Sequence, residues 1–402
     1  MRKFALIDQV VLSGSSFLLS IALARFLGPE GYGVIAITMA VVLLVSALMA
    51  SLVTAPMPVL SERVSAAKRG SYFALLLRLS LYFGLLMFLL ALAGFSWLFE
   101  DFSSQLMAAV FLTCYVLVEF SRRAGFAFGY PTVSVKWDFF YGAIRAVIAI
   151  LAAIGFIVGP EQVIHWLAVG SFLVLVGYWV ALFSPLSTDQ PNAGLRKVFF
   201  RFHWRQGRWL VLGQLFYWLG SQSFVFILSA KGAVSDGGIF GALLALGGAV
   251  NLLYQGMESY APKRLSRKGR EWHGKKFPRE LWEEFKLELG LVLSLCLLGY
   301  VFSDEVLSLV YGQAYVHAAT ALEFMMFYYA LGFFQKIMFF FARAREQARV
   351  VSDSQLLGAL AAFFTALVLV EDYGVVGATV ALVVGQSVSI ATTLFRFQGN
   401  EL

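Results

Sequence analysis

The sequence predicts an all-α polytopic membrane protein, with about twelve transmembrane helices in two pseudo-symmetric six-helix lobes. Hydrophobic residues make up 60% of the 402 residues and charged residues only 14%, whereas soluble domains carry about 25% charged residues. The apolar residues fall in runs of about twenty, the length that a helix needs to cross the hydrocarbon core. Lipid cannot pair with backbone polar groups, and the runs lack the alternation of a β-barrel, so helices are expected.

The apolar runs and the segments between them define the expected organisation. The spans are expected at residues 4–26, 33–60, 72–98, 105–128, 138–158, 163–184, 208–229, 238–260, 284–302, 318–341, 351–370 and 375–396. We expect an N-terminal six-helix lobe over 1–184, a cytoplasmic inter-lobe linker over 185–207 and a C-terminal six-helix lobe over 208–402. The linker begins Pro-rich and ends basic and aromatic, which is typical of a helix in the headgroup layer.

The charges alternate from one connection to the next. One set of connections is basic, as at Arg122–Arg123 and Lys263–Lys276, and the opposite set is short and mostly acidic, as at Glu100–Asp101 and Glu371–Asp372. By the positive-inside rule, both termini are expected in the cytoplasm and the helix count is even. The formal charge of +7 therefore reflects membrane orientation, and no nucleic-acid partner is expected.

The two halves of the chain resemble each other. The segment TAPMPVLSERVSAAKRG pairs with SYAPKRLSRKGREWHGKK, and GPEGYGVIA pairs with VSDGGIFGA. The offsets agree, at 206 residues from Pro56 to Pro262 and 207 from Gly31 to Gly238. Such a repeat predicts a pseudo-two-fold axis along the membrane normal, with a binding site between the lobes.

No catalytic or metal-binding signature is found. The four histidines are scattered, and the sequence contains no HExxH, GxSxG or P-loop motif. We therefore expect no enzyme activity, no cofactor and no metal site. A transporter needs none of these features, but it needs a polar cavity between helices.

Polar and charged residues inside the spans are the candidate substrate-binding residues. An embedded cation costs about 2.5 to 3.5 kcal/mol, so it persists where it is paired, near water or useful. Arg145 is the first choice for substrate contact. Stripes of polar residues at helical spacing face protein or water, and helix packing is the alternative explanation for them. The full set is Arg145, Arg78, Lys336, Arg122, Asn251, Gln255, Glu258, Gln9, Ser13, Gln214, Tyr217 and Trp218.

Three segments resemble the Wzx-type polysaccharide flippases of the multidrug, oligosaccharidyl-lipid and polysaccharide exporter (MOP) superfamily. They are LARFLGPEGYGVIA, LSLVYGQAYVHAATALEFM and EDYGVVGATVALVVGQ, in the family's order. In the first segment we expect structural turn residues, because glycine permits a tight reversal, proline ends a helix and arginine reaches the headgroups. These residues are Arg25, Gly28, Pro29, Gly31 and Gly33.

The resemblance implies two six-helix bundles around a cationic cavity. It implies flipping of an undecaprenyl-pyrophosphate-linked oligosaccharide, such as an O-antigen unit of lipopolysaccharide, to the outer leaflet of the bacterial inner membrane. The expected partners are this substrate, membrane lipids, other polysaccharide-assembly proteins and a coupling ion, H⁺ or Na⁺, acting through Asp8 or Glu258.

Two alternatives stay open. One is an ion-coupled drug or cation antiporter of the same superfamily, which would require an embedded acid pair in one lobe. The other is an integral membrane polysaccharide polymerase, which would require a large outer loop.

Overall fold

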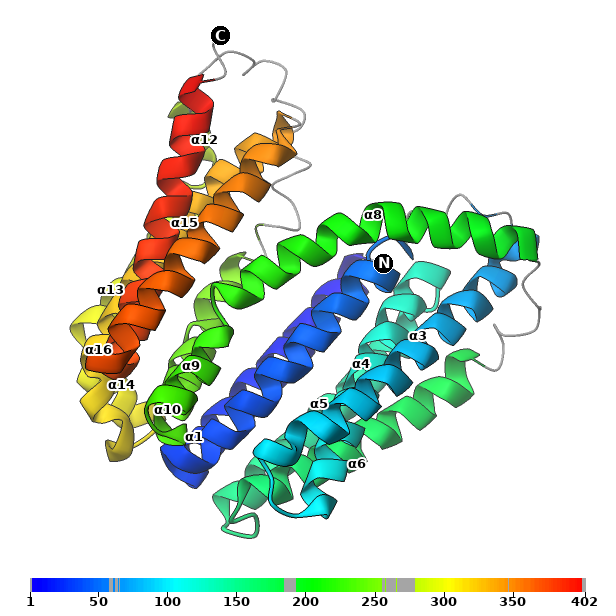
Figure 1. The fold of residues 1–402 in the computed structure, drawn as a ribbon, viewed down its shortest axis with the longest axis horizontal. Coiled ribbons are helices and arrows are strands. Elements are labelled where there is room, and N and C mark those ends of the chain that lie inside the picture. The colour runs from blue at the N-terminus through cyan, green and yellow to red at the C-terminus, as the bar shows by residue number, and fades with distance from the viewer. Residues whose placement is uncertain are drawn as a thin grey trace. The chain divides into compact units, whose positions relative to one another are not determined.

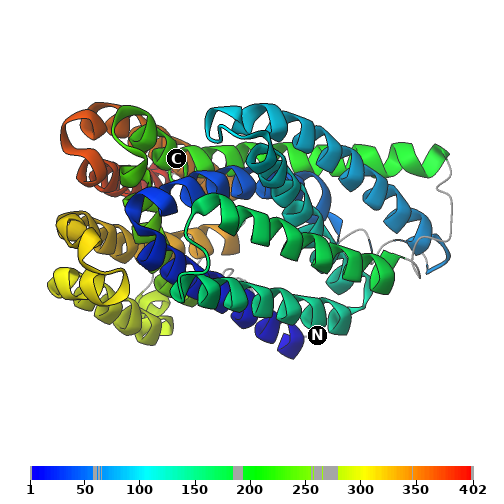
Figure 2. The same cartoon turned by 90° about the horizontal axis from the view of Figure 1, so that it is seen from below.

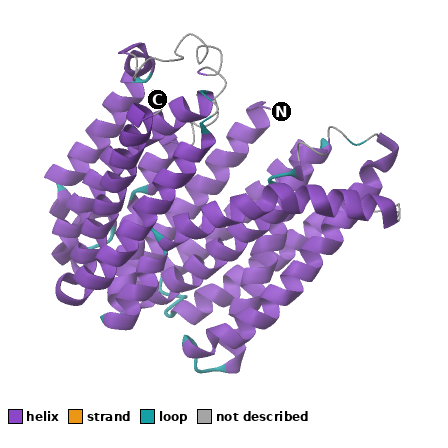
Figure 3. Ribbon diagram, turned by 45° about the horizontal axis from the view of Figure 1, so that its top comes forward, coloured by secondary structure: helices purple, strands orange, loops and turns teal. Residues whose placement is uncertain are grey.

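The chain is all-helical in the computed structural model, which describes residues 2–57, 61, 64, 66–183, 193–254, 257, 265, 279–345 and 347–399. No strand occurs among these residues, and long helices run alongside one another within each unit (Figures 1, 2 and 3). The chain divides into two compact units, Met1–Leu27 with Ile37–Leu215, and Gly28–Ala36 with Phe216–Leu402.

The first unit contains most of the elements up to the middle of the chain. They are α1 (Arg2–Met49), the π-helix η1 (Ala50–Thr54), α3 (Ala66–Gly94), the 3₁₀ turn η2 (Phe95–Trp97), α4 (Phe102–Phe128), α5 (Pro131–Ala153), α6 (Pro160–Tyr178), the π-helix η3 (Trp179–Phe183) and most of α8 (Ala193–Leu219). Local sequence signals determine where some of these helices begin and end. Asp101 caps α4 by accepting from the Ser104 backbone N–H at 2.7 Å, and Gly129 ends that helix with φ 91°.

The second unit contains the remaining elements. They are α9 (Ser223–Lys231), α10 (Val234–Leu246), α12 (Arg279–Glu284), α13 (Lys286–Val301), α14 (Ser303–Val310), the 3₁₀ segment η4 (Gln313–Ala318), α15 (Ala319–Ala344) and α16 (Ala348–Gly399). Lys231 joins α9 to α16 by donating to Glu371 Oε2 at 2.9 Å and to the Leu367 carbonyl at 3.0 Å.

The helices match the predicted fold class of a multi-pass membrane protein. Among the described residues, eight helices are long and apolar enough to cross a membrane, and α13 with α14 forms a further span bent by 88°. Helices α1 and α16, of 48 and 52 residues, are each long enough to cross twice, and they break at Gly28 (φ 71°) and Gly374 (φ 52°). Helix α5 is not among these eight, because it carries Lys136, Asp138 and Arg145 within 23 residues, and it completes the twelve expected spans.

Some predicted boundaries differ from the helices. The expected spans 4–26 and 33–60 lie largely in one kinked helix, α1, and the expected span 208–229 falls on α8 and α9, which residues 220–222 separate. The fifth helix begins at Pro131 rather than near 138, because proline is favoured in the first turn and polar residues are tolerated there. Hydropathy detects the apolar part of a helix but not its polar ends.

The turn after Gly28 packs closely against α10 within the second unit. A Cβ atom added at Gly238 would lie 1.9 Å from the Pro29 carbonyl oxygen, and one at Gly33 would lie 2.1 Å from the Val234 carbonyl oxygen. Gly31 and Gly238 are the residues that the internal repeat pairs. The matched segments of the two halves therefore contact each other, and only glycine fits there.

Helix α8 docks on the first unit through a buried histidine. His203 Nδ1 lies 3.0 Å from the Leu52 carbonyl, and Nε2 lies 2.9 Å from the Tyr72 hydroxyl. A carbonyl only accepts, so Nδ1 carries the proton and Nε2 accepts from Tyr72. The Phe199 ring lies tilted against the Tyr72 ring, with the ring centres 4.6 Å apart. A Cβ atom added at Gly207 would lie 2.9 Å from the Ser51 carbonyl oxygen. One face of α8 is therefore fixed against η1 and α3.

We predict that Gly238→Ala destabilises the chain by about 1 to 3 kcal/mol, because the added methyl group overlaps the Pro29 carbonyl oxygen. Gly290→Ala is the matched control, since nothing lies within 4 Å of a Cβ atom there, and it is expected to stabilise α13 by about 0.4 to 1 kcal/mol. Thermal unfolding of both variants in detergent measures the difference. Equal midpoints for the two variants would rule out the close contact.

We predict that α8 docking weakens in acid. Burial lowers the pKa of His203 from its ordinary 6.5, and the hydrogen bond to the Leu52 carbonyl partly opposes this shift. A histidine with a lowered pKa stabilises the docked state fully above about pH 6.5, and this contribution is lost as the pH falls below that value. The stability difference between the wild type and His203→Gln should shrink between about pH 7.5 and 5. A pH-independent difference would contradict the prediction.

Candidate functional site

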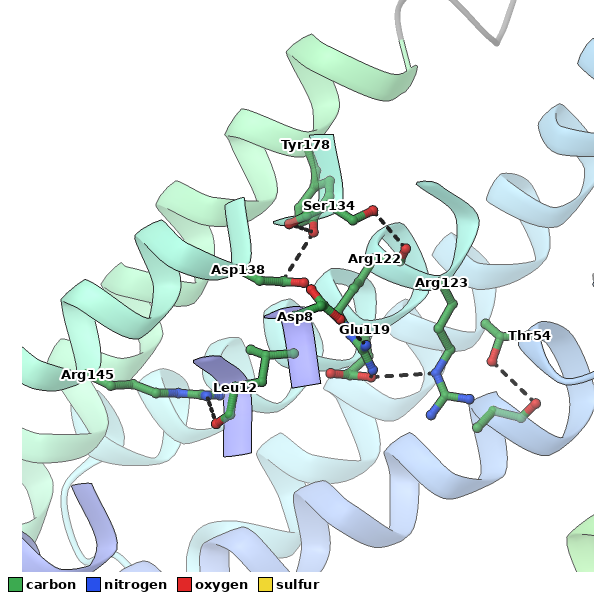
Figure 4. Close-up of polar contacts among 11 residues, drawn as sticks. Asp8, Leu12, Thr54, Glu119, Arg122, Arg123, Ser134, Asp138, Arg145 and Tyr178 are labelled. Carbon is green, nitrogen blue, oxygen red and sulfur yellow. Dashed lines mark hydrogen bonds and ion pairs between the residues drawn. The ribbon is translucent and has the colours of Figure 1, made fainter. Parts of the chain in front are cut away.

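A buried charged cluster joins four helices of the first unit. It consists of Asp8 on α1, Glu119 and Arg122 on α4, Asp138 on α5 and Tyr178 on α6, and we name it the Arg122 cluster (Figure 4). Arg122 donates through its two terminal nitrogens to Asp8 Oδ2 and Glu119 Oε2, both at 2.9 Å. Tyr178 donates to Asp138 Oδ1 at 3.2 Å. The guanidinium thus links α1 to α4, and the phenol links α5 to α6.

The cluster places three acids around Arg122, and Arg123 adds a longer contact of 3.6 Å to Glu119. Asp8 is 2% and Asp138 0% exposed, and their side chains are hydrogen-bond neighbours. Asp8 Oδ1 and Asp138 Oδ2 have no donor among the described residues. The pair is therefore a carboxylate-rich point in the interior of the first unit.

Arg145 is held by helix packing next to this cluster. It is 5% exposed, and its Nη1 donates to Ser16 Oγ at 2.8 Å and more weakly to the Leu12 carbonyl at 3.4 Å. Its guanidinium carbon lies 4.0 Å from the centre of the Tyr141 ring. These contacts join α5 to α1. Substrate contact by Arg145, the first choice from the sequence, stays a prediction.

The second unit contains a polar pocket of about 170 Å³. It is lined by tyrosines, amides and two cations from α8, α15, α16 and the end of the α10 span, including Tyr217, Asn251, Tyr254, Tyr328, Gln335, Lys336, Arg343, Gln355, Gln386 and Ser389. Gln386 Nε2 donates to Gln335 Oε1 at 2.8 Å, and Gln335 Nε2 donates to Ser389 Oγ. These two hydrogen bonds fix the orientation of both amide groups, so the wall of the pocket presents defined donors and acceptors.

The charge of this pocket is positive. Lys336 and Arg343 contribute cationic side chains, and no acidic residue is present in its described lining. Cationic groups beside tyrosine rings and amides favour an anionic ligand with hydroxyl groups. A lipophilic cation would meet repulsion from both side chains.

The structure brings together only some of the residues expected from the sequence. Tyr217, Asn251 and Lys336 share the pocket of the second unit, and Arg122 lies in the cluster of the first. Arg78 and Gln214 are exposed and line neither site. Trp218 packs against Phe226, with ring centres 5.6 Å apart. Ser13 is half-buried on α1, while Gln255, Glu258 and the side chain of Gln9 lie outside the described residues.

Sequence reasoning missed several lining residues. Gln335, Gln386 and Ser389 form the hydrogen-bonded wall, and Arg343 supplies the second cation. A signal was present, because Gln335 and Gln386 are amides in otherwise apolar helices, where each needs a polar partner.

The structural comparisons identify the fold. No protein-family model matches the chain, and no curated protein is significantly similar in sequence. An inward-facing multidrug resistance MATE family transporter of the MOP superfamily superposes with a TM-score of 0.76 at 15% identity, covering 98% of this chain and 94% of that one. The lipid II flippase MurJ in an inward closed conformation gives a TM-score of 0.74 at 12% identity, covering 99% and 88%. An outward-facing MATE transporter gives 0.65 at 15% identity, covering 98% and 92%.

The fold is thus one that membrane transporters of the MOP superfamily share. The chain is a multi-pass membrane protein with this fold. The expected fold is confirmed, whereas membership of the superfamily and of its Wzx-type subfamily stays a prediction.

We predict that Arg122→Gln destabilises the chain by about 3 to 5 kcal/mol, because it leaves Asp8 buried without its cation. Arg396→Gln is the matched control, since it breaks an exposed pair with Asp353 of the same 2.9 Å length, which is worth about 0 to 1 kcal/mol. Thermal unfolding in detergent compares the two. A loss no larger than that of the control would show that the cluster is not held by this ion pair.

Proposed function

We propose that the chain flips an undecaprenyl-pyrophosphate-linked oligosaccharide from the cytoplasmic to the outer leaflet of the bacterial inner membrane by alternating access. The observation that carries this proposal is the pocket of the second unit, with two cations, several tyrosines and amides, and no acid in its described lining. The phosphates of such a substrate favour Lys336 and Arg343. Its sugar hydroxyls favour Gln335, Gln386 and Asn251, and its ring faces favour tyrosine.

The comparisons support the transport part of this proposal. One of the three structural neighbours is the lipid II flippase MurJ, and the other two are MATE transporters. Under this proposal the basic connections face the cytoplasm, where both termini lie, and other polysaccharide-assembly proteins supply the substrate. Arg145 and Arg78 stay candidates for guiding the phosphates.

An ion-coupled drug or cation antiporter is the second candidate function. The Asp8 and Asp138 pair favours it, because the pair is the embedded acidic site in one unit that such an antiporter requires. This pair also suits a flippase driven by H⁺ or Na⁺, so the acids do not separate the two functions. The charge of the cargo separates the two functions, because Lys336 and Arg343 repel a cation.

A membrane polysaccharide polymerase has less support. That function would require a large outer loop. On the acidic side, connections such as 98–101, 154–159 and 232–233 are only a few residues long.

We predict that Lys336→Gln with Arg343→Gln slows flipping of a fluorescent lipid-linked oligosaccharide at least about tenfold in energised proteoliposomes. Each lost charge-assisted hydrogen bond is worth about 1.5 to 3 kcal/mol. Arg349→Gln, on an arginine whose side chain is 89% exposed, is the control and should retain the wild-type rate.

The opposite outcome has a clear signature. If the wild type exchanges a lipophilic cation for protons and leaves the oligosaccharide distribution unchanged, the chain is an antiporter. Full flipping by the double variant would remove the pocket from the substrate path.

A further inference from the structure

The first half of α8, residues 193–209, has exposed cations and aromatic rings whose chemistry the transport cycle does not explain. This segment precedes the candidate span Leu210–Lys231 in the same helix. It therefore lies where the helix enters the membrane. Phe199, His203 and Gly207, spaced four residues apart, are buried against η1 and α3. That docking fixes which residues point outward.

The outward face combines cations with large aromatic rings. Lys197, Arg201 and Arg205 are exposed and recur at helical spacing. Phe200 and Trp204 lie between them and are 59% and 54% exposed. Helix α8 contains no acidic residue over Ala193–Leu219. A strip of cations with exposed aromatic rings is poorly matched to water.

We propose that this outward face of α8 binds the headgroups of anionic phospholipids in the leaflet at which the helix enters the membrane. Phosphate groups pair with the lysine and arginine side chains, while the aromatic rings enter the interface between headgroups and acyl chains. Free phosphate would satisfy the cations but not the rings. A bilayer lipid satisfies both.

The proposal has a structural consequence for the junction of the two units. Helix α8 is continuous across the boundary between them, which lies at Leu215 and Phe216. Lipid bound at 193–209 therefore acts on the segment that connects the units. This role is independent of which cargo the chain carries.

Brominated lipids, which quench tryptophan fluorescence on contact, test the proposal in the full-length chain. The difference in signal between the wild type and Trp204→Phe isolates Trp204. In vesicles of zwitterionic phosphatidylcholine mixed with phosphatidylglycerol, bromine on the phosphatidylglycerol should quench Trp204 more than bromine on the phosphatidylcholine. High salt should reduce this preference.

In the triple variant Lys197→Gln, Arg201→Gln and Arg205→Gln, the preference for phosphatidylglycerol over phosphatidylcholine should fall at least about tenfold. Each charge near an anionic surface changes binding about fivefold. The triple variant Lys286→Gln, Arg349→Gln and Arg396→Gln removes the same charge from exposed positions of the second unit and should keep it. If the first variant does not fold, Arg201→Gln alone should show a partial loss.

Three results would overturn the proposal. They are equal quenching of Trp204 by the two lipids, no quenching by either, and the same loss in both triple variants. The assay measures no transport, so its outcome is separate from the test of the proposed function.

Discussion

The absence of water from the bilayer interior governs this structure, because every polar group there needs a partner from the protein. Hydroxyl groups meet the requirement within their own helix, as Ser80 and Ser121 do by donating to the carbonyls of Leu76 and Leu117 at 2.8 and 2.7 Å. Charged groups cost more to bury and pair both within a helix and across helices. The Arg122 cluster is the clearest result, since its guanidinium bridges carboxylates from α1 and α4.

The two polar sites differ in chemistry. The cluster of the first unit carries three acids around Arg122, whereas the described lining of the second unit's pocket carries Lys336 and Arg343 with amides and tyrosines. An acid-rich site suits a small cation or proton, and a cation-rich site suits an anionic headgroup. Under the function proposed above, the pocket of the second unit is the part that holds the anionic headgroup.

The sequence predicted the positions of the helices better than the contacts between them. Hydropathy locates apolar runs, and the Gly28 and Pro29 pair marks a reversal that the structure shows as a break in α1. The contact of Asp8 with Asp138, and that of Gln335 with Gln386, depend on how each helix is rotated about its axis. A helix that is apolar on all sides can face lipid or protein with any side, so its sequence contains little information on its rotation about the axis. For the same reason, the packing of Arg145 against α1 could not be separated from substrate contact.

The short segment Gly28–Ala36 groups with the second unit although it lies near the start of the chain. Its close neighbours, Val234, Gly238 and Gly241, are synthesised some two hundred residues later. During insertion into the membrane, the segment Gly28–Ala36 therefore lacks its contacts until α10 has been synthesised. Assembly of the amino-terminal half ends only after the carboxy-terminal half has begun to enter the bilayer, so the halves mature together rather than in succession.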